Sequence, residues 1–304
     1  MTAFLRRLPV PAGCVALGLI GLSTLLGSLS PLFLHGFGIL SLLLQFAVLL
    51  KLLLPGALGT VCSDSVTLST LAGTSMALML TAAQLKKAMS FPGAVWIWYF
   101  GLCLHLLILL LFSRKLLQER PGLSGVRGSW LLVYVGIAAA AISAPAFGTE
   151  KLGLLLLLPA ALGAVILLPL VYRADLQPGN VPPGQKPLFC ITAAPVSIWL
   201  VGFLSVSYSP SRPLVLVLLC VAQLLYVPAL IRCLRCLRSS FSPAFAAFTF
   251  PFVISASALK QASALFLLPS LAAILLTAEC VIALLLCLYV LLLYLRHLFG
   301  AVRS

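Results

Sequence analysis

Ten strongly hydrophobic segments run along this chain, and their composition alternates. The odd-numbered segments are rich in Gly, Ala, Ser, Thr and Pro, whereas the even-numbered segments are dominated by Leu, Val and Ile. Residues 136–145 hold five alanines, for example, and residues 152–158 hold six leucines. A leucine-coated helix can face lipid, while small residues allow close backbone approach. The alternation predicts five helical hairpins, each with one inner and one outer helix, and five inner helices around an axis would enclose a pore.

The hydrophobic segments account for most of the chain. It has 304 residues, of which 62% are hydrophobic and 8% are charged. One crossing of the hydrocarbon core takes roughly 20 apolar residues. We therefore expect an all-α integral membrane protein, a single ten-helix domain over residues 1–304, with spans at 8–27, 32–53, 66–85, 93–113, 129–147, 152–172, 187–207, 213–234, 243–264 and 267–295.

The basic residues of the short loops indicate the orientation. If both termini are cytoplasmic, 14 of the 19 Lys and Arg residues lie on the inner side, as the positive-inside rule requires. We therefore expect a multi-pass protein of the plasma (inner) membrane with both termini in the cytoplasm. Arg6 and Arg7 before an apolar run resemble a signal peptide, but Pro9, Pro11 and the charge balance favour a retained first helix. The inner set is Arg6, Arg7, Lys51, Arg114, Lys115, Arg120, Arg127, Arg173, Lys186, Arg232, Arg235, Arg238, Arg296 and Arg303.

Residues that could carry catalysis are scarce. The chain has five acidic residues, and four of them fall in loops or at helix ends. We find no paired carboxylates, no Ser/His/Asp set, no phosphate-binding loop and no metal-ligand cluster, so we expect no enzyme, no metal and no cofactor. The pair Cys233 and Cys236 has zinc or redox spacing but no second pair. The net charge of +14 is spread singly over helix ends, which favours lipid headgroups over nucleic acid as its partner.

Glu279 is the exception, because it lies in the middle of the tenth, leucine-rich segment. We interpret it as a protonated or hydrogen-bonded structural group that faces a neighbouring helix, and proton coupling is the alternative. The predicted inner helices carry no ionised side chain near mid-membrane. Cation pathways and proton relays usually place Asp or Glu there, so basic ends without deep carboxylates favour small inorganic or organic anions as cargo.

The ninth segment contains the candidate gate. At 3.6 residues per turn, Phe250 shares a face with Pro243, Ala247, Ile254 and Ser257, which are small or of moderate size. Phe248 shares the opposite face with other bulky apolar residues. A single ring on a small-residue face could close a narrow pore by dewetting; packing against another helix is the alternative. The further pore-lining or kink candidates are Pro9, Pro11, Cys14, Pro145, Pro195, Ala247, Pro251, Ile254 and Ser257.

Several motifs resemble the tellurite-resistance/dicarboxylate transporter (TDT) family, which includes the plant slow anion channels. The segments that resemble its first, fifth, seventh and ninth helices are residues 9–19, 130–146, 194–205 and 247–251, in the family's order. The resemblance implies ten helices in five hairpins, a quasi-fivefold central pore, commonly a homotrimer, and a pore-occluding phenylalanine that maps onto Phe250. The chain departs from the family pattern at Cys14, where a glycine is usual, and before Thr74-Ser75-Met76, where a proline is common.

Two transport functions remain open at this point. The first is passage of small anions through a central pore closed by Phe250. The alternative is a proton-coupled carrier or exporter of C4-dicarboxylates or a related metabolite, since a partly protonated acid needs no protein carboxylate. A membrane-embedded enzyme would need convergent catalytic residues that the sequence does not show.

Overall fold

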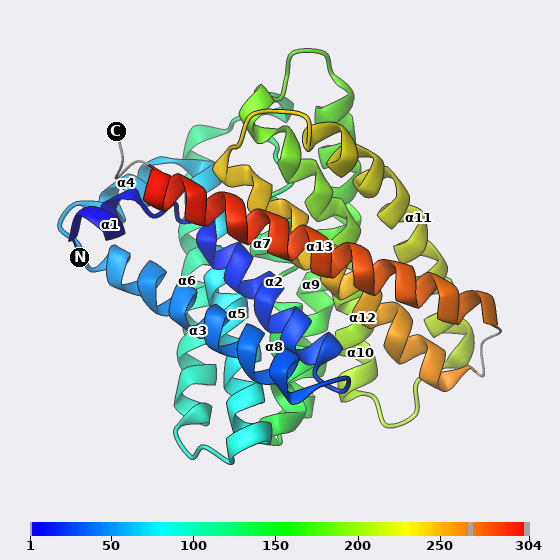
Figure 1. Ribbon diagram of the computed structural model, residues 1–304. Coiled ribbons are helices and arrows are strands. Elements are labelled where there is room, and N and C mark those ends of the chain that lie inside the picture. Colours follow the sequence, from blue (N-terminus) through cyan, green and yellow to red (C-terminus); the bar gives the residue numbers. More distant parts are fainter. Residues whose placement is uncertain (1, 267–269, 301–304) are drawn as a thin grey trace.

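The computed structural model describes residues 2–266 and 270–300, and every element in these ranges is a helix (Figure 1). Short 3₁₀ helices, labelled η, interrupt or precede several of the α-helices. The elements are α1 (Thr2–Arg7), α2 (Ala12–Leu26), α3 (Pro31–Leu52), α4 (Ala57–Ser63), α5 (Ser65–Met89), α6 (Ala94–Glu119), η1 (Leu123–Gly125), α7 (Trp130–Tyr134), α8 (Ala138–Ser143), η2 (Ala144–Phe147), α9 (Glu150–Leu176), η3 (Pro183–Ala193), α10 (Ala194–Val206), α11 (Arg212–Cys236), η4 (Pro243–Phe248), α12 (Phe250–Leu265) and α13 (Ser270–Gly300).

Eight helical segments in the described residues are long and apolar enough to cross a membrane. Ala12–Leu26 and Ala138–Phe147 are apolar but shorter. The predicted boundaries of the leucine-rich segments agree with the helices to within a few residues, except that α6 extends to Glu119 and α13 to Gly300. The first three residues of the predicted span 267–295, and Arg303 of the predicted inner charges, lie outside the described residues.

Burial follows the alternation in composition. In the leucine-rich spans α3, α6, α9, α11 and α13, only 17–33% of the most apolar window is buried. In the small-residue spans formed by α5, by η3 with α10 and by η4 with α12, the share is 72–83%. Leucines such as Leu43, Leu110 and Leu158 project from the outer helices with exposures of 60–66%. These surfaces suit contact with lipid, and the small-residue segments form the interior.

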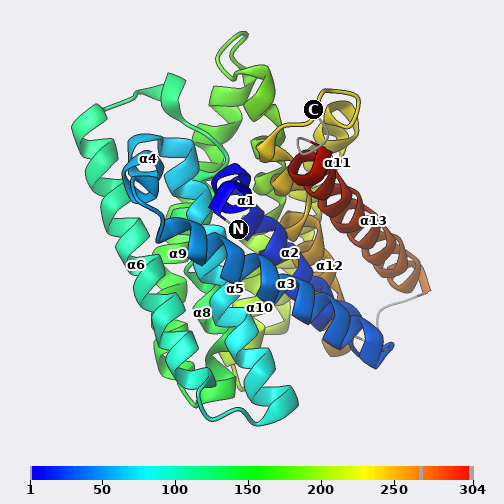
Figure 2. The ribbon, with the colours of Figure 1, turned by 60° about the vertical axis from the view of Figure 1, so that its left-hand side comes forward.

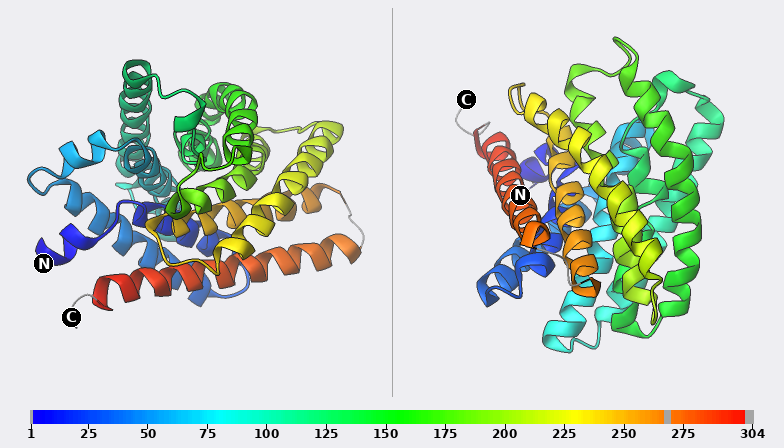
Figure 3. Two further views of the ribbon diagram at one scale, coloured as in Figure 1. Left: turned by 90° about the horizontal axis from the view of Figure 1, so that it is seen from above. Right: turned by 90° about the vertical axis from the view of Figure 1, so that its right-hand side faces the viewer.

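The interior segments form a closed cycle of contacts. α2 packs against α5, α5 against α7 and α8, α8 against α10, α10 against α12, and α12 against α2. Each outer helix covers a neighbouring interior segment: α3 covers α2, α6 covers α5, α9 covers α8, α11 covers η3 and α13 covers α12. In the view from above, α6 and α9 are seen nearly end-on, whereas α13 lies obliquely across the molecule (Figure 3).

The helix ends are sorted to two sides. The N-terminus, the end of α13 and the loops that follow α6, α9 and α11 lie toward the same end of the molecule (Figures 1 and 2). The loops that follow α5 and α10 lie toward the other end (Figure 1). These helices therefore run up and down through the molecule in chain order.

Three interior segments are interrupted helices, which the continuous spans predicted from sequence missed. α7 and α8 are separated by residues 135–137, η3 changes to α10 at Ala194, and η4 changes to α12 at Phe250. Pro195 and Pro251 lie in the first turns of α10 and α12. Proline lacks an amide hydrogen and its ring collides with the carbonyl four residues earlier, so it fits best at a helix start. The outer helices α9 and α11 nevertheless continue through Pro159, Pro169 and Pro228.

Two sequence predictions need correction. The 3.6-residue periodicity applied to the ninth segment fails before Phe250, because residues 243–248 form a 3₁₀ helix. The first span was predicted from residue 8, but α2 begins at Ala12 after Pro11, and residues 2–7 form the separate helix α1. The short helix α4 was not anticipated.

Sidedness can be tested by single cysteines on a cysteine-free background. Gln177 follows α9 and Ser209 follows α10, and both residues are exposed. We expect Gln177→Cys and Ser209→Cys to react with a membrane-impermeant maleimide from opposite sides of a sealed vesicle. Labelling of both positions from the same side would contradict the up-and-down order of the helices.

Candidate functional site

A wide cavity opens at the end of the molecule that holds the N-terminus. Its volume is about 540 Å³, and it lies between the ends of α1 and α3, the helix α4, and the starts of α2, α5, η3 and η4. Arg6 and Lys51 line it together with threonines 60, 67 and 70 and Gln185. The Lys51 ammonium donates hydrogen bonds to the carbonyls of Leu5, at 3.3 Å, and Arg6, at 2.9 Å. The cavity therefore combines positive charge with hydroxyl and amide groups.

Two much smaller cavities continue from the wide one. The first, of about 20 Å³, shares lining residues such as Pro11, Thr70 and Pro243 with the wide cavity. The second, of about 10 Å³, shares Leu132, Ile191 and Phe250 with the first. A cavity needs about 10–15 Å³ to hold one water, so the interior narrows from a wide mouth to spaces of about one water molecule.

All five interior segments contribute to the first narrow cavity. Its lining comes from α2 and the residue before it, from α5, from α7, from η3, and from η4 with α12: Pro11, Cys14, Leu17, Thr70, Leu132, Leu188, Ile191, Pro243, Ala244, Ala246, Ala247, Phe250 and Pro251. The alanines come from η4, whereas α2, α7 and η3 supply larger apolar side chains and α5 supplies Thr70. The narrow region is therefore apolar and lies where the interior segments converge.

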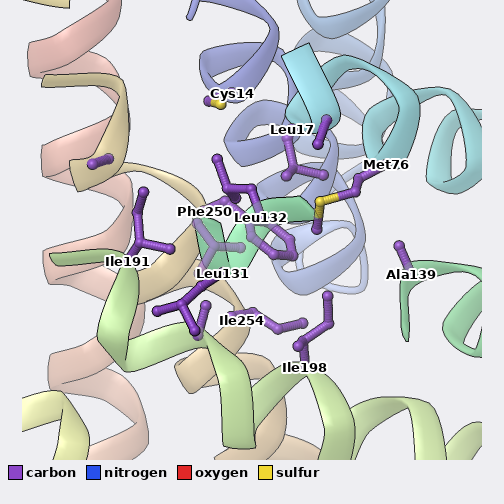
Figure 4. Close-up of a cluster of buried hydrophobic side chains, with 14 of the residues drawn as sticks. Cys14, Leu17, Met76, Leu131, Leu132, Ala139, Ile191, Ile198, Phe250 and Ile254 are labelled. Atoms are coloured by element: carbon purple, nitrogen blue, oxygen red, sulfur yellow. The ribbon is translucent and has the colours of Figure 1, made fainter. Parts of the chain in front are cut away.

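Phe250 is the residue around which this region is arranged. Its side chain lines both narrow cavities and is 2% exposed. Figure 4 shows the ring in the middle of the apolar cluster, beside Leu132, with Cys14 toward one end and Ile198 and Ile254 toward the other. Because Phe250 is the first residue of α12, the break between η4 and α12 decides where the ring points.

Close contact with α2 fixes the backbone at this break. A Cβ atom on Gly18 would lie 2.5 Å from the Thr249 Cβ and 3.1 Å from the Phe250 amide nitrogen. The Thr249 hydroxyl is within 3.0 Å of the Cys14 carbonyl and 2.8 Å of the Ala246 carbonyl, so it can donate to either. Small residues on α2 therefore let the two backbones meet and hold the start of α12 in place.

The other phenylalanines of the ninth segment pack away from the cavities. The rings of Phe245 and Phe248 are in contact, with centroids 4.9 Å apart, and Phe252 meets Tyr226 of α11 edge-on at 5.4 Å. None of these three phenylalanines lines a described cavity. The sequence analysis also placed Phe250 on a different face from Phe248, but it assumed the wrong helix geometry for residues 243–248.

A known protein family matches most of the chain. Residues 8–298 match the voltage-dependent anion channel family. The chain belongs to this family. The predicted resemblance to the TDT family and its slow anion channels is thereby confirmed. No curated protein matches the chain.

Membership of the voltage-dependent anion channel family identifies a multi-pass membrane protein of anion transport. Members of the family are channels or transporters rather than enzymes. In the part of the chain that the structure describes, no three His, Cys, Asp or Glu side chains are grouped as a metal site requires.

Apart from Phe250, the predicted site residues of this anion channel family member differ in which cavity they line. Pro9 and Pro11 line the wide cavity; Pro11, Cys14, Ala247 and Pro251 line the first narrow cavity; and Pro195 lines the second. Pro145, Ile254 and Ser257 line none of the three. Pro145 lies in the 3₁₀ turn η2, and Ile254 is buried one turn beyond Phe250.

The sequence interpretation missed several lining residues, chiefly Met76, Leu132, Leu188 and Ile191. They lie within small-residue segments, but their own size gave no sign that they face the interior. The positions of Leu132 and Ile191 near the interruptions after α7 and η3 could have indicated these two, because a broken helix turns side chains away from the regular face. Met76 lies within the uninterrupted helix α5 and gave no such signal.

Glu279 lies apart from this region. It is 1% exposed in α13, with the Gln223 amide of α11 as a polar neighbour. It lines none of the three cavities. The interpretation of Glu279 as a structural group therefore stays a prediction, and the narrow cavities are lined without any charged side chain in the described residues.

The contact between α2 and the break before Phe250 can be tested with one methyl group. We expect Gly18→Ala to destabilise the fold by about 1–3 kcal/mol, the usual cost of overpacking, because the new Cβ collides with Thr249. Gly36→Ala is the matched control, since a Cβ there has no atom within 4 Å. Thermal unfolding in detergent, followed by fluorescence, measures both. Equal stability of the two variants would contradict the tight contact.

Proposed function

We propose that this protein is an anion channel whose pore is closed by the side chain of Phe250. One observation carries the proposal: a single buried ring lines both narrow cavities at the place where all five interior segments converge. Membership of the voltage-dependent anion channel family indicates that the transported ion is an anion. The cavities supply a path that widens toward a basic mouth and narrows to the size of one water molecule at the ring.

The proposed architecture is a single domain over residues 1–304 with ten transmembrane helices in five hairpins around a quasi-fivefold pore. The eight long segments and the two shorter apolar helices together give ten. The closed cycle of contacts from α2 through α5, α8, α10 and α12 supports a fivefold arrangement. We further propose a homotrimer, which rests on the family resemblance.

The distribution of charge supports both the orientation and the selectivity. The proposed cytoplasmic side holds both termini and 14 of the 19 basic residues, so both ends of the chain face the inside of the plasma (inner) membrane. Arg6 and Lys51 at the wide cavity attract anions to the mouth. Among the described residues, the lining of the narrow region includes neither a carboxylate, which would repel the anion, nor a cation, which would hold it too strongly for conduction.

The mechanism is physical and involves no chemical step. An anion collects in the wide cavity, where threonine hydroxyls and the Gln185 amide can replace part of its water. Entry into the narrow cavities strips the remaining hydration, because they hold about one water molecule each. The Phe250 ring then blocks passage and keeps the apolar constriction dry. Conduction requires the ring to turn, and the neighbouring alanines of η4 offer it small side chains rather than bulky ones.

Removal of the Phe250 ring tests the gate. We expect Phe250→Ala to raise anion conductance per channel by about tenfold or more, since each 1.4 kcal/mol removed from a barrier gives that factor. Phe248→Ala is the control: its ring is equally buried but lines no described cavity. Both substitutions remove a buried ring, which typically costs about 3–5 kcal/mol of stability. Single-channel recording in planar bilayers separates gating from protein yield, and equal conductance of the two variants would refute the assignment.

The sign of the permeant ion can be measured in the same bilayers. Under a potassium chloride gradient, the reversal potential of Phe250→Ala should lie near the chloride equilibrium value, because no carboxylate faces the narrow cavities. It should not shift when a pH gradient is added, since a channel couples to no proton. A reversal near the potassium value would exclude an anion channel. Flux that requires the proton gradient would favour the carrier instead.

A further inference from the structure

His105 lies on the outer helix α6 but reaches the interior. Its side chain is fully buried, and both ring nitrogens have partners. Nδ1 is 2.8 Å from the Ser75 hydroxyl of α5, and Nε2 is 3.0 Å from the Val133 carbonyl of α7. One imidazole thus joins an outer helix to two interior segments. Neither hydrogen bond takes part in attracting anions to the wide cavity, and neither involves the ring of Phe250.

The carbonyl that His105 contacts belongs to the break between α7 and α8. In a continuous α-helix the Val133 carbonyl would accept from the amide of Ile137. Here it accepts from the His105 Nε2–H instead. The backbone beyond it continues with shorter-range bonds: the amides of residues 138, 139 and 140 donate to the carbonyls of residues 135, 136 and 137 at 2.9–3.0 Å. His105 therefore provides the partner that the break would otherwise deny to a buried carbonyl.

The two partners of His105 set the tautomer of its imidazole. The Val133 carbonyl can only accept, so the ring proton lies on Nε2, and Nδ1 is left to accept from the Ser75 hydroxyl. The same hydroxyl lies 2.8 Å from the Ala72 carbonyl of its own helix, and its single proton is shared between the two acceptors. Ser75, His105 and Val133 form a relay of fixed direction from α5 through α6 to α7.

This relay ends at the wall of the constriction. A Cβ atom on Gly136 would lie 2.5 Å from the Met76 sulfur and 3.1 Å from the His105 Cε1, so the broken segment is pressed directly against both side chains. Gly136, Met76 and Leu132 line the second narrow cavity together with Phe250. Movement of the break would therefore move the wall that Phe250 faces across this cavity.

We propose that His105 is a positioning residue for the conduction pathway, a role that rests on the proposed channel function. His105 accepts a hydrogen bond from the Ser75 hydroxyl and donates one to the Val133 carbonyl. These two bonds keep α7 and α8 apart and hold Gly136 and Leu132 at the constriction. Without that donor, the Val133 carbonyl recovers a partner most easily from Ile137. That change closes the break into a continuous helix and shifts the wall beside Phe250.

Trp98 provides a matched comparison on the same helix. Its indole Nε1–H donates to the Ser143 hydroxyl of α8 at 2.7 Å, and its side chain is fully buried. It also joins α6 to the third interior segment by one hydrogen bond, but neither Trp98 nor Ser143 lines a described cavity. Loss of this bond by Trp98→Phe reproduces the structural cost without touching the break.

The experiment measures unitary conductance and the relative permeability of nitrate and chloride, with His105→Asn, His105→Gln and Trp98→Phe each added to Phe250→Ala. The Asn side chain places its amide near the position of Nδ1 and loses the hydrogen bond to Val133. The longer Gln side chain places its amide near the position of Nε2 and keeps that bond. We expect His105→Asn to change conductance by at least about fivefold, the lower end of the cost of an unpaired buried carbonyl. His105→Gln should restore the value, and Trp98→Phe should leave it unchanged.

Two results would overturn the proposal: equal conductance of the His105→Asn and Trp98→Phe proteins, or the same defect in His105→Gln as in His105→Asn. If His105→Asn does not fold, Ser75→Ala makes a smaller lesion at the start of the relay, and it should shift conductance in the same direction; an unchanged Ser75→Ala protein also contradicts the proposal. A Phe250→Ala protein without any anion conductance would refute the channel function itself, and this role with it.

Discussion

The bilayer demands that each backbone hydrogen bond be made within the protein, and the whole arrangement follows from that demand. Regular helices meet it alone, so the outer segments can be long, leucine-rich and exposed to lipid. An interrupted helix cannot meet it alone, and an interruption is tolerated only where other parts of the protein surround it. The interrupted segments are accordingly the interior ones, and all three interruptions have their backbone covered by side chains or neighbouring helices.

The same constraint explains why small residues are concentrated in the interior. Gly18 lets the backbone of α2 come into direct contact with the start of α12. Gly136 lets the break after α7 pack directly against the side chains of Met76 and His105. Larger side chains at these positions would separate the segments and expose carbonyls that water cannot reach. The small residues of the interior segments therefore serve as contact points between backbones, while larger residues such as Leu132 and Ile191 narrow the passage.

Much of this fold could be predicted from the sequence, because a membrane crossing leaves a long and unambiguous hydrophobic signal. The span predicted at 32–53 is Pro31–Leu52 in the structure, and the alternation of composition became an alternation of burial. The 3₁₀ helix before Phe250 was missed because it has the same apolar residues as an α-helix and differs only in hydrogen bonding. His105 appeared in the sequence only as an isolated histidine, since its partners come from two other segments.

The three interruptions differ in permanence. Those before α10 and α12 are each followed by a proline in the first helical turn, Pro195 and Pro251. A proline has no amide hydrogen to donate to the preceding turn, so these two segments cannot complete the hydrogen bonding of a regular helix across the interruption. The interruption between α7 and α8 has no proline in residues 135–138 and is held open from outside by a side chain. Two of the interruptions in the passage wall are thus set by proline residues. The third depends on a hydrogen bond from the His105 side chain and is therefore reversible. A large rearrangement of the passage wall would therefore cost the least free energy at the interruption between α7 and α8.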